Sequence, residues 1–524
     1  MRHHRFWLIL WVSMGLYSSG VEVHAEIIQA SATSSELSFY FDSDPTGLFL
    51  NEKPTFKSPV VNRVECQRES VRKVGQLFRF TIPRYEKARD LASSLFSLKS
   101  DNGVWRLVEQ VSSKNSEPYP VNSSKKGLQV QMVDDAVALG IKHAALNVDF
   151  SSLTLLQAGP SSIAHVFEGT EYFFSSGYLN GLDQQVKRLS DNSILVNLII
   201  LNYDHGDAKT NVLRHPHYDP SCPNHLGAFN LSTAEGIGHY KATIDFLASR
   251  YGAMNAEHGR VWGFIVGNEV NSHWEWYNLG NASVKEFVED YIDAVRLCEF
   301  YSKKQLWNSR TYISLEHHWN MAGGGKGATN HYFKGKDMVD QFASQSEEMG
   351  GFAWNLAFHP YPENLFECRT WNDKTALPGF DTPRITFKNI EQLPAYFKRP
   401  VQLFHNSPRH IILSEQGFHS VNTPQGETNQ AAAYAYAYYK IAHLDGIDSF
   451  ILHRHVDHGM EGGLNLGLWT RNTRSRSQSE PERKKLIYEV FEHADKPDWQ
   501  DYFRFALPVI GIKSWEDLLD SSMH

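Results

Sequence analysis

Two glutamates directly follow apolar runs that have the character of strands, and their side chains are suited to acid–base chemistry. Glu269 comes just after the run 261–266, and Glu415 just after the run 410–413. A carboxylate that follows a buried strand is costly unless it is paired or lies in a solvated cleft. Two facing carboxylates suit the cleavage of a glycosidic bond, because one protonates the leaving oxygen while the other attacks the sugar or activates water.

Further polar and aromatic residues stand at the ends of the other apolar runs or in the loops that follow them. Histidine and tyrosine side chains there can position a carboxylate, and a tryptophan next to one can both bury it and stack on a sugar ring. The predicted substrate-binding residues are Asn268, Trp274, Trp276, His318, His359, Tyr361, His453 and Trp469. Trp319 and Trp371 are predicted to lie in loops on the same face.

The segments that must position these residues alternate short apolar runs with amphipathic stretches. The predicted strands are 141–148, 166–174, 194–201, 261–266, 312–315, 352–358, 410–413 and 447–452, with helical patterns between or after them. Alternating strands and helices imply a parallel sheet with right-handed crossovers. Eight such units predict an α/β fold of the (β/α)8 TIM barrel type, in which catalytic residues lie at the carboxyl ends of the strands. A doubly wound open sheet is the competing fold, but no GxGxxG motif opens any of the helices.

The position of the two glutamates within this order is informative. They follow the fourth and the seventh predicted strands, which lie on opposite sides of an eight-stranded barrel. Side chains from the ends of these strands can therefore meet across the mouth of the barrel. A gap of roughly 5 Å between the carboxyl groups predicts retention of anomeric configuration, and about 6.5–9.5 Å predicts inversion.

The parts of the chain outside the barrel divide into two segments. Residues 1–25 have a basic start, a short apolar run and a small-x-Ala ending, which together predict a secretory signal peptide. Residues 26–130 show short alternating runs separated by Pro, Ser, Asn and Gly, which predict a small β-rich module. The barrel is assigned to residues 131–524. No later stretch is apolar enough to span a membrane, so the mature protein is expected to be secreted or periplasmic.

The composition is that of a globular protein, and its charge disfavours nucleic acid as a partner. The 524 residues carry 51 Lys and Arg against 59 Asp and Glu, a formal charge of −8, whereas proteins that bind nucleic acid usually have a concentrated basic face. The loops show no clear basic rim for a sulfated or uronic substrate, and the nearest contributors are His217, Lys326 and Arg454. Residues 471–480 are predicted to be a polar loop. Oligomeric state does not follow from the sequence.

Three short motifs follow predicted strands in order along the chain: Asn268-Glu269, His359-x-Tyr361 and Ser414-Glu415-x-Gly417. Their combination resembles the pattern of clan A glycoside hydrolases, which are retaining enzymes on a (β/α)8 barrel. The resemblance covers residues 261–417. Residues 126–147 also resemble an exported bacterial family of unassigned function, so no substrate follows from that second resemblance.

The resemblance to clan A implies roles for five residues. Glu269 would be the general acid/base and Glu415 the nucleophile. Asn268 would bind the sugar hydroxyl next to the reacting carbon. Tyr361 would donate a hydrogen bond to the nucleophile, and His359 would position the acid/base. These roles require no cofactor and no metal, and they imply a poly- or oligosaccharide substrate.

Two other functions remain open at the level of sequence. A metal-dependent hydrolase on the same barrel would use clustered histidines, which occur here as His215/His217, His317/His318 and His453/His455/His458. A barrel that binds glycan without cleaving it is the third possibility, and the pair of glutamates argues against it. Loss of activity in a chelator with both glutamates intact would favour the metal-dependent enzyme.

Four cysteines are present: Cys66, Cys222, Cys298 and Cys368. Four cysteines can pair in three ways, and their spacing matches no zinc motif. Cys298 lies in an apolar helical pattern and is expected to be a buried thiol. Cys222 and Cys368 fall in loops predicted on one face, so a disulfide between these two is an expectation to test.

Overall fold

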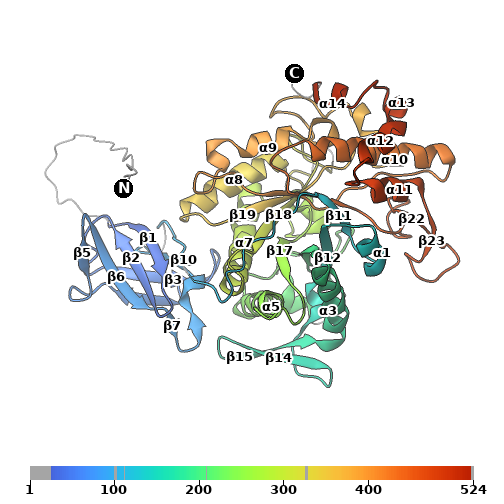
Figure 1. Ribbon diagram of the computed structural model, residues 1–524. Helices are drawn as coiled ribbons and strands as arrows, with labels where there is room; N and C mark the ends of the chain where they lie inside the picture. Colours follow the sequence, from blue (N-terminus) through green and yellow to red (C-terminus); the bar gives the residue numbers. More distant parts are fainter. Residues whose placement is uncertain (1–24, 100–102, 111, 208, 325–327, 521–524) are drawn as a thin grey trace.

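The computed structural model describes residues 25–99, 103–110, 112–207, 209–324 and 328–520, and its centre is a closed barrel of parallel strands (Figure 1). In order, the eight strands are β11 (Lys126–Gln129), β12 (His143–Asp149), β16 (Leu195–Leu201), β17 (Val261–Val266), β18 (Arg310–Glu316), β19 (Trp354–His359), β20 (Ile411–Leu413) and β21 (Ser449–Leu452). The first strand, β11, pairs in parallel with both β12 and β21 and so closes the barrel. The predicted TIM barrel is confirmed. The predicted signal peptide lies outside the described residues, apart from Ala25.

The strand predicted at 166–174 is wrong. This segment belongs to a hairpin of β14 (Ser162–Phe167) and β15 (Thr170–Ser175), whose strands pair antiparallel outside the barrel. Its apolar residues pack on a surrounding helix and not inside the barrel. The Phe174 ring stacks on Phe246 of that helix, with ring centroids 4.1 Å apart. The missing barrel strand is β11, which lies before residue 131. Its sequence, KGLQ, is too short and too polar to show the apolar run of a buried strand.

Close packing explains the glycine in β11. A Cβ added to Gly127 would lie 2.8 Å from the Ile451 side chain and 2.9 Å from the His143 carbonyl oxygen. The flanking Lys126 is buried in the strand, and its ammonium group donates to the carbonyl oxygens of Glu492 and Ala494. A lysine can therefore occupy a barrel strand because backbone oxygens satisfy its charge.

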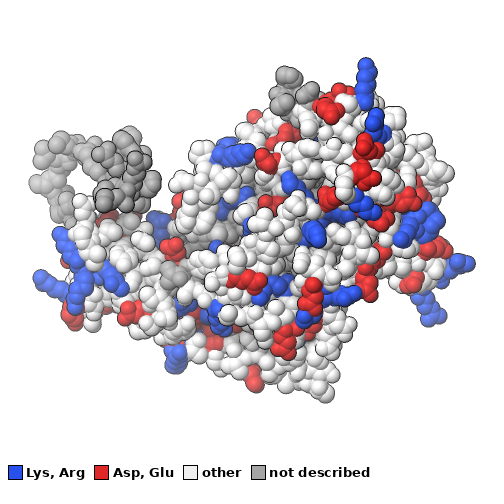
Figure 2. All heavy atoms as spheres, viewed as in Figure 1, with Lys and Arg blue, Asp and Glu red and all other residues white. Residues whose placement is uncertain are grey.

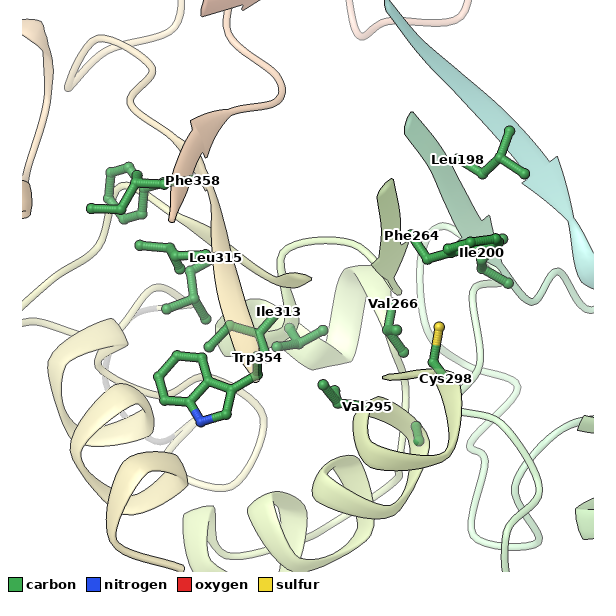
Figure 3. Close-up of a cluster of buried hydrophobic side chains, with 14 of the residues drawn as sticks. Leu198, Ile200, Phe264, Val266, Val295, Cys298, Ile313, Leu315, Trp354 and Phe358 are labelled. Carbon is green, nitrogen blue, oxygen red and sulfur yellow. The ribbon is translucent and has the colours of Figure 1, made fainter. Parts of the chain in front are cut away.

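Helices surround the barrel as predicted. They include α3 (Ser176–Asp191), α5 (Ala234–Gly252), α7 (Val284–Gln305), α8 (Gly335–Glu348), α9 (Gln392–Phe397), α10 (Pro424–Ala442) and α11 (Leu486–His493). The longest, α7, begins at a capping box in which Ser283 and Glu286 satisfy each other's backbone N–H groups. Its inward residues Val295 and Cys298 pack on the outer faces of β16 to β18, as Figure 3 shows.

Several barrel strands are almost entirely apolar because both of their faces are covered. All seven residues of β16 are buried. Leu198 and Ile200 face the helices, while Ile199 and Leu201 join a separate cluster inside the barrel. This inner cluster also contains Ile265, Tyr312, Ala357, Ile412 and Ile451, and it forms the packed base beneath the carboxyl ends of the strands.

The predicted N-terminal β-rich module is confirmed as two main sheets beside the barrel, whose strands pair antiparallel except for the parallel pair β1 and β10 (Figure 1). The larger contains β1 (Ile27–Ala32), β2 (Glu36–Phe41), β5 (Arg72–Val74), β6 (Leu77–Pro83) and β10 (Glu109–Gln110), and the smaller contains β3 (Phe49–Lys53), β4 (Asn62–Glu65) and β9 (Leu95–Ser97). Polar contacts fix the module to α7. The Phe56 N–H donates to Asp293 Oδ2 at 2.7 Å, and Arg296 Nη1 donates to the Ser93 carbonyl at 2.8 Å.

The expected disulfide between Cys222 and Cys368 is wrong, because all four cysteines are buried free thiols. The Cys222 thiol contacts the Tyr218 hydroxyl at 3.3 Å. Burial raises the pKa of the Cys368 thiol to about 12. Among the described residues, no helix has both the length and the apolar character needed to cross a membrane.

Candidate active site

A cavity of about 770 Å³ opens at the carboxyl ends of the barrel strands. The predicted site residues that line it are Asn268, Glu269, Trp276, His318, Tyr361, Glu415 and His453. His359 lies just beneath this surface and is almost completely buried. The inner apolar cluster supports the cavity from below, with Tyr203 and Trp276 packed on it.

The turn after β17 places Glu269 in the cavity. Gly267 has φ +74°, and a Cβ there would lie only 2.5 Å from the Tyr277 ring, so this position requires glycine. Glu269 itself adopts a left-handed conformation with φ 41°, which is unusual for a residue with a side chain. The Ser314 hydroxyl holds this conformation by accepting the Glu269 backbone N–H at 3.0 Å. Such local strain is typical of functional sites.

The Glu269 carboxyl group is largely removed from water. Burial raises its pKa to about 7, with a further contribution from the charge of Glu415, and contact with His359 limits the rise. The His359 ring links the two sides of the barrel, because Nδ1 lies 2.8 Å from Glu269 Oε1 and Nε2 lies 3.0 Å from the Ser414 hydroxyl. A carboxyl group with this pKa retains a large fraction of its proton near neutral pH, as a general acid must.

The Glu415 carboxylate is held in the opposite protonation state. Tyr361 donates its hydroxyl to Oε1 at 3.2 Å, and Gln129 donates its amide to Oε2 at 2.9 Å. Burial acts to raise the pKa of Glu415, but the charges of His453 and His359 and the Gln129 hydrogen bond outweigh it and lower the pKa below its usual value. Glu415 is therefore ionised at a pH at which Glu269 keeps its proton.

The two carboxyl groups lie close together. One oxygen of Glu269, one ring nitrogen of His359 and one oxygen of Glu415 all lie within 4.8 Å of one another. Glu269 and Glu415 follow β17 and β20, and His359 ends β19, so the curvature of the barrel brings them to one point. A sugar bound in the cavity can be reached by both carboxyl groups.

His453 has a different setting from the predicted contact with a sugar alone. Its Nδ1 lies 2.5 Å from Gln129 Oε1, and its Nε2 lies 2.7 Å from Glu461 Oε1. Both oxygens are acceptors, because the Gln129 amide nitrogen is already donating to Glu415. Both ring nitrogens must then carry hydrogen, which makes His453 an imidazolium ion. Gln129 lies between this cation and Glu415, because it accepts a hydrogen bond from His453 and donates one to Glu415.

A third buried carboxylate lies beside Glu269 at the end of β18. Glu316 Oε1 accepts hydrogen bonds from Asn271 and Ser272, at 2.6 and 3.0 Å, and Oε2 accepts from the backbone N–H and the ring Nδ1 of His318. Burial opposes ionisation, but these hydrogen bonds prevail and lower the pKa of Glu316 to about 2. Because Arg384 donates to His318 Nε2 at 3.1 Å, the ring of His318 is fixed at the cavity wall.

Of the five tryptophans predicted on this face, Trp276 lines the cavity and the other four do not. Trp274 stacks on His331, with ring centroids 3.9 Å apart. Trp469 donates its indole N–H to Asp135 at 3.0 Å, Trp319 is fully buried, and Trp371 packs against Tyr436. The structure therefore does not bring Trp274 and Trp469 to the predicted substrate surface, because neighbouring side chains already cover their rings.

Comparison with known proteins places the chain in a family. Residues 118–518 match the profile described as "Family of unknown function (DUF5722)". The chain belongs to this family. A search of curated proteins finds no match.

Two solved structures resemble this DUF5722 chain at low identity. A family 39 glycoside hydrolase from the gut symbiont Bacteroides cellulosilyticus WH2 is 13% identical over 87% of this chain and 78% of its own, with a TM-score of 0.44. A hyperthermophilic beta-glucosidase from Pyrococcus furiosus is 10% identical over 72% of this chain and 86% of its own, also with a TM-score of 0.44. The strand pairing of this chain by itself shows its closed barrel.

Several of the histidines considered as metal ligands in this DUF5722 protein contact other polar side chains. His215 contacts the Ser232 hydroxyl, and His455 contacts Asp135, both at 2.8 Å. The compact group Glu316, His317 and His318 has ligand atoms within 4.8 Å of one another, but both oxygens of Glu316 already accept two hydrogen bonds each. A metal ion would have to break these bonds, so this donor set does not fit one.

Sequence reasoning missed several cavity residues of the DUF5722 protein. Gln129 was missed because its strand, β11, was not recognised, although it stands directly at the strand's end. Glu461 lies in the long loop after β21, and no local pattern marks it as a partner of His453. Tyr203 and Glu316 follow or end predicted strands, so position alone identifies them as further cavity residues.

Proposed function

We propose that this protein is an exported glycoside hydrolase that cleaves a poly- or oligosaccharide with retention of configuration. One observation carries the proposal: a buried and a half-buried carboxyl group share a cavity, and their surroundings shift their pKa values in opposite directions, to about 7 for Glu269 and below the usual value for Glu415. Carboxyl groups separated in this way supply an acid and a nucleophile at the same pH.

The reaction follows from these protonation states. Glu415 attacks the anomeric carbon while Glu269 donates its proton to the leaving oxygen, which gives a covalent glycosyl-enzyme. Glu269, now ionised, then removes a proton from water, and the water displaces Glu415 from the sugar. A closest approach within 4.8 Å between carboxyl oxygens supports this double displacement, because inverting enzymes leave about 6.5–9.5 Å for a water molecule.

The surrounding residues have supporting roles in this proposal. Asn268 binds the hydroxyl next to the reacting carbon, and its amide makes no hydrogen bond within the described part of the chain, so it is available to substrate. Tyr361 orients Glu415, and His359 orients Glu269. Trp276 offers a ring face to the sugar, and His318 an imidazole fixed by Glu316.

The stereochemical outcome tests the proposal. We expect the first product released from a cleaved glycoside to keep the anomeric configuration of the substrate, because two inversions restore it. Proton NMR during the first minutes of hydrolysis separates this product from its slowly formed anomer. An initial product of inverted configuration would contradict the double displacement, and hydrolysis abolished by a chelator in the wild type would favour a metal-dependent enzyme.

Export is part of the proposal and rests on residues 1–25. Cleavage after Ala25 would release a protein that begins at Glu26, in the periplasm or the medium. N-terminal sequencing of protein recovered from each compartment tests this, and intact protein found solely inside the cell would contradict it.

Loss of the His453 charge is expected to impair catalysis through Glu415. In His453→Gln, the lost cation favours protonation of Glu415, so the acidic limb of the kcat/KM profile moves to higher pH. We expect kcat/KM at neutral pH to fall by on the order of 10- to 100-fold, the equivalent of one charged hydrogen bond. His453→Lys should restore part of this loss.

The shape of the pH profile distinguishes this effect from simple disruption of the site. The control is His458→Gln, which also lines the cavity but contacts neither Gln129 nor Glu415 by hydrogen bond. An acidic limb that stays in place in folded His453→Gln would refute the role assigned to the imidazolium.

A further inference from the structure

A second cavity, of about 680 Å³, lies next to the catalytic cavity. His458 and Leu464 line both cavities, so the segment between them is a shared wall. Gly462 faces the catalytic side and Gly463 the other, and neither has a side chain to obstruct passage between the two. The two cavities are therefore neighbours across a single loop segment.

The second cavity borders the most basic hairpin of the described chain. Its strands are β22 (Trp469–Arg471) and β23 (Pro481–Lys484). Residues 471–485 contain six Lys and Arg against two Glu, although the whole chain has a net charge of −8. Figure 2 shows blue side chains gathered at the right-hand edge of the molecule, where Figure 1 places this hairpin. In the sequence, the predicted loops show no clear basic rim for a sulfated or uronic substrate. In the structure, this hairpin provides basic side chains beside the second cavity.

Most charged side chains around this cavity already have partners. The ion pairs are Arg483 with Glu427 at 2.5 Å, Lys485 with Asp457 at 2.9 Å and Arg474 with Glu482 at 3.3 Å. These pairs use the acidic groups Glu427, Asp457 and Glu482 that line the cavity. Arg471 also lines the cavity and takes part in none of these pairs.

Arg471 is partly buried and faces the shared wall. Its guanidinium carbon would lie 3.0 Å from a Cβ added to Gly459, so the absence of a side chain at Gly459 makes room for it. Within the described residues, its guanidinium group makes no hydrogen bond and no ion pair. A partly desolvated guanidinium presents several fixed donors that match a carboxylate or a sulfate group.

Among the described residues that line the catalytic cavity, none is a comparable free cation. Arg454 and His453, which line it, both pair with Glu461. The sugar unit at Glu269 and Glu415 is then expected to be neutral at that wall, and an acidic unit would bind beyond it.

We propose that the second cavity is a subsite for the carboxylate or sulfate group of an acidic glycan, with Arg471 as its anion-binding residue. This inference rests on the proposed function for the position of the substrate, and it adds the class of substrate. The glycan extends from the catalytic cavity past His458 and Leu464, so the protein recognises a chain of sugars and not a single one.

The test compares Arg471→Gln with Arg476→Gln. Arg476 lies on the same hairpin but does not line the cavity, so the control removes the same charge. Binding is measured by calorimetry with full-length mature Glu415→Gln protein, using matched oligosaccharides that are neutral, uronic or sulfated. We expect Arg471→Gln to weaken binding of an acidic oligosaccharide by about tenfold or more, the loss of one charge-assisted hydrogen bond, and to leave the neutral one unchanged.

Several outcomes would overturn the inference. They are equal weakening by both arginine variants, equal losses for neutral and acidic ligands, absence of any binding preference for acidic ligands, and Arg471-dependent binding of a short RNA tighter than that of any glycan. The uronic and sulfated arms identify which acidic group is bound. If acidic glycans bind through Arg471 but the wild type cleaves none, the proposed function fails while the subsite stands. If neutral glycans alone bind and are cleaved, the subsite fails while the proposed function stands.

Discussion

Glu415→Ala is expected to lower kcat by about 10⁴- to 10⁶-fold, because the covalent intermediate can no longer form. Azide is small enough to enter the space left by the missing carboxylate and to attack the anomeric carbon directly. We expect added azide to restore part of the turnover on an activated aryl glycoside, with release of a glycosyl azide of inverted configuration. The measurements are initial rates with and without azide, and NMR of the product.

The matched control for Glu415→Ala is Glu275→Ala. Glu275 also lines the cavity, but its carboxylate accepts a hydrogen bond from the Tyr332 hydroxyl and takes no part in the proposed reaction. We expect its rate to stay within a few-fold of the wild type. Unchanged turnover of every cleaved glycan by Glu415→Ala would eliminate the glycosidase mechanism. Binding of glycans without turnover by the wild type would instead favour a non-catalytic barrel.

Glu269→Gln is expected to lower kcat/KM by about 10²- to 10⁴-fold, the usual contribution of general acid–base catalysis. The pH profile gives the sharper result. The acid must carry its proton to act, so wild-type kcat/KM should fall as pH rises through about 7, the raised pKa of Glu269. The glutamine variant has no proton to lose there, and its profile should be flat over that range.

The leaving group provides the control for Glu269→Gln. A glycoside with an acidic phenol as leaving group needs little protonation, so the first step should be much less impaired than with a natural sugar leaving group. Azide should again increase turnover in Glu269→Ala, but the glycosyl azide should here retain the configuration of the substrate. A basic limb that persists unchanged in Glu269→Gln would assign the ionisation near pH 7 to another group.

The sequence predicts those barrel strands whose packing on both faces requires a run of apolar residues. Strands such as β16 and β17 are apolar at nearly every position because helices cover one face and the barrel interior the other. The residue after such a strand lies at the mouth of the barrel, so Glu269 and Glu415 could be located without any contact information. The four-residue strand β11 and the hairpin at 162–175 were misassigned, because a short polar strand and an amphipathic hairpin give no such pattern.

The solvent environment of each side chain could not be predicted in the same way. Trp274 and Trp276 both follow β17, and Trp469 opens β22. His331 packs on the ring of Trp274 and Tyr488 on that of Trp469, whereas Trp276 lines the cavity. Neither of these partners lies within two turns of the tryptophan it covers. The sequence therefore does not distinguish a tryptophan that packs against the protein from one that faces a ligand.

By itself, the sequence determined the α/β barrel and the positions of two carboxyl groups at its mouth, because both depend on residue types within a single strand and its end. Only the tertiary structure shows the physical reason why one carboxyl group holds a proton and the other does not. Glu415 takes its state from the charges of His453 and His359 and from Gln129, which is 286 residues away in the chain. Glu269 takes its own from burial and from His359, 90 residues away. Desolvation and charge act through space and not along the chain. The pKa values of the two glutamates therefore become different only when the barrel closes and brings their neighbours together.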